Sequence, residues 1–179
     1  AVLEDEQADT LLQNRIRPLF DSPQESLFVI VLDCLRYDHW RAFTSILAPY
    51  FAVEREEAYF SILPTATQYA RNAIFSGLFP LDIHERYPKL WVFDDEEGGK
   101  NANEENLLRE FLTRNRLNVK WSYTKVITNE HGKAFEDNAL NLCQNDVNFV
   151  VVNFIDLIAH ARAEMILIKE LAPDEAAFR

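Results

Sequence analysis

The sequence predicts an α/β fold with a mostly parallel sheet, because two apolar runs are separated by segments of helical spacing. Residues 26–33 and 147–154 are continuous runs rich in Val, Ile, Leu and Phe, which is typical of strands buried on both faces. Helical and strand-like segments alternate along the chain, as they do in parallel sheets with crossover helices. We see no internal repeat or low-complexity tract, and therefore expect one domain.

Each element follows from a local signal. Apolar residues that recur every three or four positions predict a helix, and a Gly or Pro beyond them ends it. Short runs enriched in β-branched and aromatic residues predict strands. The helix candidates are residues 9–20, 37–47, 68–76, 106–116, 133–143 and 155–171, with a last short helix from Pro173. The strand candidates are 26–33, 58–63, 119–126 and 147–154, whereas 81–103 is expected to be irregular, with an exposed acidic loop at 94–100.

Composition excludes several classes of function. The 179 residues include 18 Lys and Arg against 29 Asp and Glu, a formal net charge of −11. Binding to nucleic-acid backbones depends on clustered Lys and Arg, so we expect no general nucleic-acid binding, although an enzyme could handle phosphates through metal ions. With four glycines, no Walker or dinucleotide-binding motif can be written. The two cysteines show no CxxC spacing and no apolar run reaches the ~18 residues of a membrane span, so we expect a cytoplasmic protein without membrane insertion.

Carboxylates follow both of the strongly apolar strands. Asp33 closes the first run, and Asp156 comes shortly after the second, four residues before His160. Ligands of parallel sheets collect at the carboxyl ends of the strands, and the i, i+4 spacing places Asp156 and His160 on one helix face, as suits two ligands of one metal ion. Simpler alternatives exist. Asp33 could cap the next helix or pair with Arg36, and Asp156 could be a helix cap with His160 hydrogen-bonded inside the fold.

Two threonines, Thr65 and Thr67, stand just ahead of the helix predicted at 68–76. Either could cap that helix by accepting a hydrogen bond from a free backbone N–H. The same position also suits a nucleophile, because a helix N-terminus attracts a phosphoryl group and a metal ion could activate the hydroxyl. One turn further on, Arg71 and Asn72 could reach the phosphoryl oxygens, or they could form a salt bridge or a solvated face.

Together, a carboxylate after the first strand, a threonine at a helix start and the Asp-xxx-His spacing fit a two-metal site for phosphoryl transfer. In such sites two ions about 4 Å apart hold the attacking and leaving oxygens. Four stretches add a resemblance: the block PTATQYARNAIFSGLFP at 64–80, with support from 31–38, 96–101 and 153–162. In these stretches the chain resembles the alkaline phosphatase superfamily, and within it the PglZ domain of PorX-type response regulators of Bacteroidetes.

This resemblance implies a three-layer alkaline-phosphatase-like fold that hydrolyses phosphate monoesters or diesters with two zinc ions. It selects Thr67 as the nucleophile, places Asp33 and Thr67 at one zinc ion, and places Asp156 and His160 at the other. For the PorX branch it implies a two-component regulator in type IX secretion, with oligonucleotides or cyclic nucleotides as candidate substrates. Signalling proteins and a second copy of the chain are the candidate partners.

The chain departs from the family pattern in one respect. The family completes its metal sites with an Asp-His-Gly segment and a further His, and the 19 residues after His160 contain neither. We therefore expect a helical lead-in at 1–24 and the N-terminal portion of a catalytic domain, truncated at its C-terminus, at 25–179. For this chain by itself we expect weak metal binding and little or no activity. The alternative is a non-catalytic protein-interaction module on a phosphatase-like scaffold.

Overall fold

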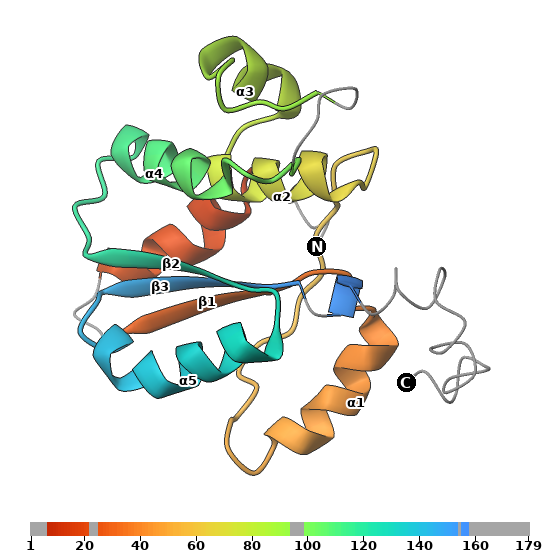
Figure 1. The fold of residues 1–179 in the computed structure, drawn as a ribbon, viewed down its shortest axis with the longest axis vertical. Helices are drawn as coiled ribbons and strands as arrows, with labels where there is room; N and C mark the ends of the chain where they lie inside the picture. The colour runs from red at the N-terminus through yellow and green to blue at the C-terminus, as the bar shows by residue number, and fades with distance from the viewer. Residues whose placement is uncertain (1–6, 22–24, 94–98, 154, 158–179) are drawn as a thin grey trace. The chain divides into compact units, whose positions relative to one another are not determined.

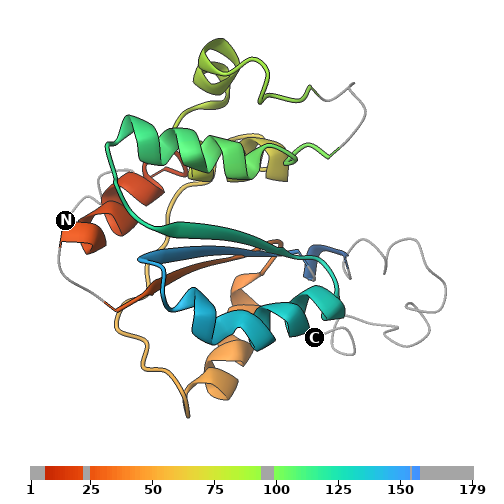
Figure 2. The same ribbon diagram turned by 60° about the vertical axis from the view of Figure 1, so that its left-hand side comes forward.

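The computed structural model describes residues 7–21, 25–93, 99–153 and 155–157 (Figures 1 and 2). These residues fall into two compact units, each built from two separate parts of the chain. The helical unit takes its described residues from Ala1–Glu25 and Glu57–Val119, and the sheet unit takes its own from Ser26–Glu56 and Lys120–Arg179.

The sheet unit is built on three parallel strands, β1 (Leu27–Leu32), β2 (Trp121–Val126) and β3 (Val147–Val152). Their order is β1-β3-β2, so β3 lies in the middle. β3 is buried from its first residue to its fifth, because it has a neighbour on each side. The predicted α/β class and the parallel sheet are confirmed.

A buried amide ties the three strands together where the sheet begins. Asn148 on β3 has no exposed surface, and its Oδ1 accepts a hydrogen bond of 2.6 Å from the Ser122 hydroxyl on β2. Its Nδ2 donates to the Ser26 hydroxyl just before β1, at 2.9 Å. Because a buried amide is costly unless it is hydrogen-bonded, these contacts favour one register for all three strands.

The described part of the sheet unit includes the helices α1 (Tyr37–Leu47) and α5 (Asn129–Leu142). Both lie on the same side of the sheet in the two views (Figures 1 and 2). Phe135 on α5 packs edge-on against Phe28 on β1, with ring centroids 6.4 Å apart. α1 has the predicted bounds but contributes no buried residue, so its apolar side chains do not add to the core of the sheet unit.

As far as its residues are described, the helical unit contains two short helical segments near the N-terminus and three α-helices, of which α2 packs against both α3 and α4. The elements are η1 (Leu12–Ile16), η2 (Arg17–Asp21), α2 (Thr67–Ser76), α3 (Pro80–Arg86) and α4 (Glu104–Arg114). Ile83, Trp91 and Leu107 form a core cluster against which Tyr69 and Leu78 pack. The helix predicted at 9–20 is present as a π turn followed by a 3-10 turn.

Gly77 ends α2 in the left-handed region, with φ of 61°. It also lies against α4, since a Cβ built at this position would stand 2.7 Å from Cδ2 of Phe111. Glycine is therefore required twice, for the backbone angle and for the close approach of the two helices. The predicted end of this helix at Gly77 is confirmed.

Three local predictions are wrong. The strand expected at 58–63 is absent, and the only bridge described there joins Phe60 to Gln7. The irregular stretch expected from 81 contains α3, which begins with Pro80 in its first turn. β1 is not buried on both faces, because it lies at an edge of the described sheet and leaves 55% of Ile30 exposed.

Some predictions fall on residues outside the described ranges, namely most of the acidic loop at 94–100 and the helix from 158 onwards. Among the described helices, none is long and apolar enough to cross a membrane.

Candidate functional site

The carboxyl edge of the sheet brings the acidic residues of the sheet unit together. β1 and β3 end in register, with Leu32 opposite Val152, so the residues that follow them emerge side by side. The backbone N–H of Asp33 donates to the carbonyl of Val152 at 3.0 Å. The Asn153 side chain donates through Nδ2 to Oδ2 of Asp33 at 3.3 Å. Asp33 therefore lies where ligands of parallel sheets are held.

Cys34 shows that Asp156 lies at the same place. Its thiol donates a hydrogen bond to the Asp156 carboxylate. Burial raises the pKa of the Cys34 thiol, and the negative charges of Asp156 and Asp33 raise it further. Both carboxylates thus approach one thiol, and the structure brings these two predicted residues together. The sequence analysis missed Cys34 and Asn153. Cys34 directly follows Asp33, and Asn153 directly follows the last residue of β3, so their positions in the chain were a usable signal.

The alternative of Asp33 as a helix cap is wrong. The residue before α1 is Arg36, and α1 has no side-chain cap. The Arg36 guanidinium contacts the Asp38 carboxylate through two hydrogen bonds of 3.0 and 2.8 Å, and the alternative of Asp33 paired with Arg36 stays open. His160 lies outside the described residues, so its predicted place beside Asp156 stays a prediction.

In the helical unit, Thr67 is the first residue of α2. The cap position belongs to Ala66, and no side chain caps the helix, so the interpretation of Thr65 or Thr67 as the cap is wrong. Thr67 is half-buried, and its hydroxyl makes no hydrogen bond within the described residues. The hydroxyl therefore has no role in holding this part of the fold, and it stands at the positive end of the α2 dipole.

Arg71 and Asn72 lie on the face of α2 that packs inward. Arg71 is only 4% exposed, and its Nε donates to Oε1 of Glu104 at 2.7 Å, while Nη2 pairs with Oε2 of the same carboxylate. Asn72 is 2% exposed and contacts Asn101 and the carbonyl of Lys100. Both side chains thus take part in a buried polar network, and their predicted contact with a phosphoryl group stays a prediction.

Comparison with known families decides what this scaffold is. Residues 11–179 match the family described as BREX system PglZ alkaline phosphatase-like domain. The chain belongs to the PglZ family. A search of curated proteins gave no match. Membership establishes an alkaline phosphatase-like scaffold for this PglZ domain.

Asp33 and Asp156 carry the carboxylate oxygens that divalent cations prefer, and the charges of both raise the pKa of the Cys34 thiol. In the described part of the chain, however, no three His, Cys, Asp or Glu side chains form a group that could hold a metal ion. A complete ligand set therefore needs donors beyond the described residues, and His160 is the one that the sequence analysis predicts. Two carboxylates alone do not distinguish zinc from other divalent ions.

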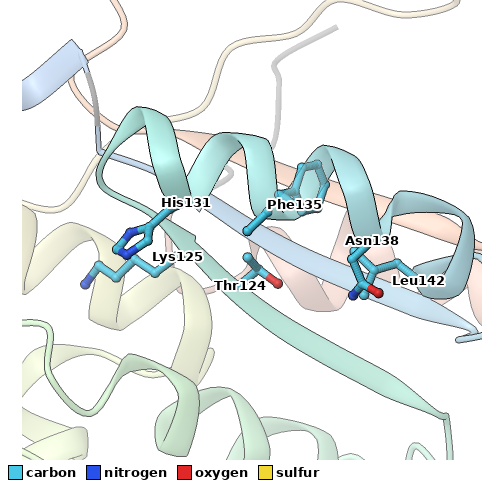
Figure 3. Close-up of a pocket in the computed structure, with 7 residues that line it drawn as sticks. Thr124, Lys125, His131, Phe135, Asn138 and Leu142 are labelled. Carbon is cyan, nitrogen blue, oxygen red and sulfur yellow. The ribbon is translucent and has the colours of Figure 1, made fainter.

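A separate groove in the sheet unit lies between β2 and α5 and has a volume of about 210 Å³ (Figure 3). Lys125 from β2 and His131 and Asn138 from α5 line it, together with the apolar Phe135 and Leu142. None of the predicted site residues lines this groove, so it contributes nothing to the site proposed below.

Proposed function

We propose that this PglZ domain is a phosphoric ester hydrolase that uses Thr67 as its nucleophile. The observation that carries the proposal is the place of Thr67, at the first position of a helix and with a hydroxyl that makes no hydrogen bond in the described fold. A hydroxyl required for folding would be paired, whereas a nucleophile must be free to meet its substrate. The family match supports this choice of scaffold.

In the proposed reaction the Thr67 oxygen attacks phosphorus, a phosphorus–oxygen bond forms to Thr67, and the bond to the leaving alcohol breaks, with the Thr67 hydroxyl proton passing to the leaving oxygen. Water then attacks the phosphate ester of Thr67, the bond to Thr67 breaks, and a proton of that water restores the hydroxyl. The N-terminal end of α2 favours the negative phosphoryl group beside Thr67. Asp33 and Asp156, with His160, would hold divalent metal ions, which we propose to be zinc. When bound, such ions lower the pKa of a hydroxyl and stabilise developing negative charge.

Thr65 provides a matched control for Thr67. It lies two residues upstream and is exposed, so Thr65→Val makes the same chemical change outside the proposed site. With zinc added, the full-length protein should hydrolyse bis-p-nitrophenyl phosphate. We expect Thr67→Val to lower kcat by roughly 10³-fold or more and Thr65→Val to lower it less than about twofold. An unchanged rate in Thr67→Val would show that the nucleophile is another residue.

Metal content tests the acidic residues separately. Asp33→Asn and Asp156→Asn should each reduce the zinc retained by the full-length protein, measured by elemental analysis after dialysis. Asp38→Asn is the control, because Asp38 pairs with Arg36 on the first turn of α1. If Asp33→Asn and Asp156→Asn retain as much zinc as Asp38→Asn, the carboxylates at the sheet edge do not bind the metal.

We also propose the biological setting that the resemblance implies, an output domain of a cytoplasmic PorX-type two-component regulator in type IX secretion. Oligonucleotides or cyclic nucleotides are the proposed substrates. The family description names the BREX system instead, and the two settings differ in an observable way. A receiver domain in the full-length protein, whose phosphorylation alters hydrolysis, would support the regulator, and its absence would favour the BREX setting.

A second candidate function is protein interaction on a phosphatase-like scaffold. α1 and the segment after it favour it, because large apolar side chains are exposed there. Tyr37 is 66% exposed, Ile46 65%, Tyr50 79% and Phe51 67%. If this function is the correct one, Thr67→Val leaves partner binding intact and the protein holds no metal, whereas Ile46→Asp weakens partner binding.

A further inference from the structure

We propose that Asn101 is a positioning residue that fixes the first turn of α2, and with it Thr67, through a clamp of two side-chain amides. The clamp consists of Asn72 on α2 and Asn101 in the segment before α4. The inference rests on the proposed function of Thr67 as nucleophile. It also gives a role to the Lys100-Asn101 pair, a stretch that the family resemblance marked without assigning it any chemistry.

The side-chain amide of Asn101 has two N–H groups, and each has a hydrogen-bond acceptor on α2. Nδ2 of Asn101 donates to the carbonyl oxygen of Thr67 at 3.3 Å and to Oδ1 of Asn72 at 3.2 Å. Asn72 makes a hydrogen bond in the opposite direction, since its Nδ2 donates to the carbonyl of Lys100 at 3.3 Å. The two amides therefore bind each other and the opposite main chain, which joins two segments more than 25 residues apart along the chain.

The clamp lies next to a buried ion pair that also joins α2 to α4. Arg71, next to Asn72 on α2, pairs with Glu104 at the start of α4, and both side chains are almost fully buried. That pair holds the middle of α2. Asn101 acts further toward the N-terminus, on the carbonyl of Thr67 itself.

The first turn is where such a tie has most effect. Helix ends fray, because the first residues lack the hydrogen bonds that hold the interior. α2 also has no side-chain cap, so the usual restraint on its first turn is missing. The Asn101 bond to the Thr67 carbonyl limits rotation of that peptide and thereby restrains the backbone from which the Thr67 hydroxyl projects. Small displacements of a reacting group, of about 1 Å, can lower a rate on the order of 100-fold.

Asn103 offers a matched control within the same segment. It is the same residue type two positions on, and its Nδ2 donates to the carbonyl of Leu90 at 3.2 Å rather than to α2. Asn101→Asp and Asn103→Asp both keep the size of the side chain, remove its N–H donors and add one negative charge. Only the first change removes the tie to Thr67.

The first measurement is hydrogen exchange in the full-length protein, which needs no activity. We expect the amides at 69–71, the first of α2 that donate helical hydrogen bonds, to exchange about tenfold faster in Asn101→Asp than in Asn103→Asp, with no such difference in α4. Equal exchange in the two variants would overturn the clamp. Should Asn101→Asp fail to fold, as judged by circular dichroism, Asn101→Ala and Asn103→Ala replace the pair, because they remove the same donors without a charge.

The second measurement is hydrolysis of bis-p-nitrophenyl phosphate. We expect kcat to fall about 10- to 100-fold in Asn101→Asp, with KM within about twofold, and both constants to stay near wild type in Asn103→Asp. An unchanged kcat in Asn101→Asp, in a protein that Thr67→Val inactivates, would overturn the inference and leave the proposed function standing. If Thr67→Val is as active as wild type, the proposed function fails, and the exchange data alone then decide whether the clamp exists.

Discussion

The Arg71–Glu104 pair makes the sharpest prediction about stability. Both partners are buried, at 4% and 1% exposure, and two guanidinium nitrogens contact the two carboxylate oxygens. Glu104→Ala would leave the Arg71 guanidinium buried without its counter-charge. Breaking a buried ion pair in this way typically costs about 3–5 kcal/mol, a large part of the ~5–15 kcal/mol that stabilises a domain of this kind.

Glu105 supplies the control, since it is the next residue along the chain but lies on the exposed face of α4. It pairs with Arg109 at 3.3 Å, and both side chains are about half exposed. Exposed pairs contribute about 0.2–1 kcal/mol, so Glu105→Ala should cost no more than that. Urea denaturation followed by circular dichroism gives both free energies of unfolding, with unchanged m-values as evidence that the same two states are compared.

A double substitution separates the structural role of Arg71 from its predicted contact with the phosphoryl group. Replacing both partners by methionine removes the two charges together, which is often close to neutral for stability. If Arg71 only supports the fold, the double variant regains both stability and hydrolysis. If Arg71 binds the phosphoryl group, stability returns and kcat does not. A cost for Glu104→Ala as small as that for Glu105→Ala would refute the reasoning.

Three further predictions concern single residues of the helical unit, each checked by urea denaturation. Gly77→Ala should lower the free energy of unfolding by about 1–2 kcal/mol for the left-handed backbone alone, and more because its Cβ would meet the Phe111 ring. Arg116, which holds φ of 56° after α4, should gain about 0.5–1 kcal/mol when replaced by Gly, whereas Arg116→Ala should gain nothing. Burial, with a smaller contribution from Asp82, raises the pKa of Asp9, so its ionisation costs stability as pH rises through that pKa. Asp9→Asn should therefore stabilise the protein at pH 7, and this advantage should shrink as pH falls toward 4; an advantage independent of pH would contradict the assignment.

The regular elements of the fold were largely predictable, for a physical reason. β3 and α5 carry strong local patterns, a run of buried β-branched residues and an amphipathic helix with a Thr128 cap, and local patterns are visible in a sequence. Residues 58–63 have the composition of a strand, but within the described ranges they pair with no neighbouring strand, apart from one bridge at Phe60. Strand formation depends on such a partner, and no single segment reveals whether one exists.

The candidate site was predictable in part. Asp33 and Asp156 could be expected at one edge because parallel strands end together, and the structure brings both to Cys34. The polar network around α2 could not be foreseen. Glu104 follows Asn103 and precedes another glutamate, so nothing local distinguishes the buried carboxylate from the exposed one. Its partner Arg71, 33 residues away, supplies the positive charge that makes this burial possible, because an unpaired charge would not be buried.

A nucleophile places two opposing demands on the chain that carries it, since its backbone must be held while its reactive oxygen stays unbound. α2 meets both demands, because Asn101 ties the carbonyl of Thr67 and leaves the hydroxyl outside the network. The carboxylates of the sheet unit are oriented in a comparable way. Asp33 and Asp156 receive hydrogen bonds from Asn153 and Cys34, and these neutral donors orient the carboxylates without adding positive charge. Each unit thus orients its own polar groups by contacts that leave their chemistry available.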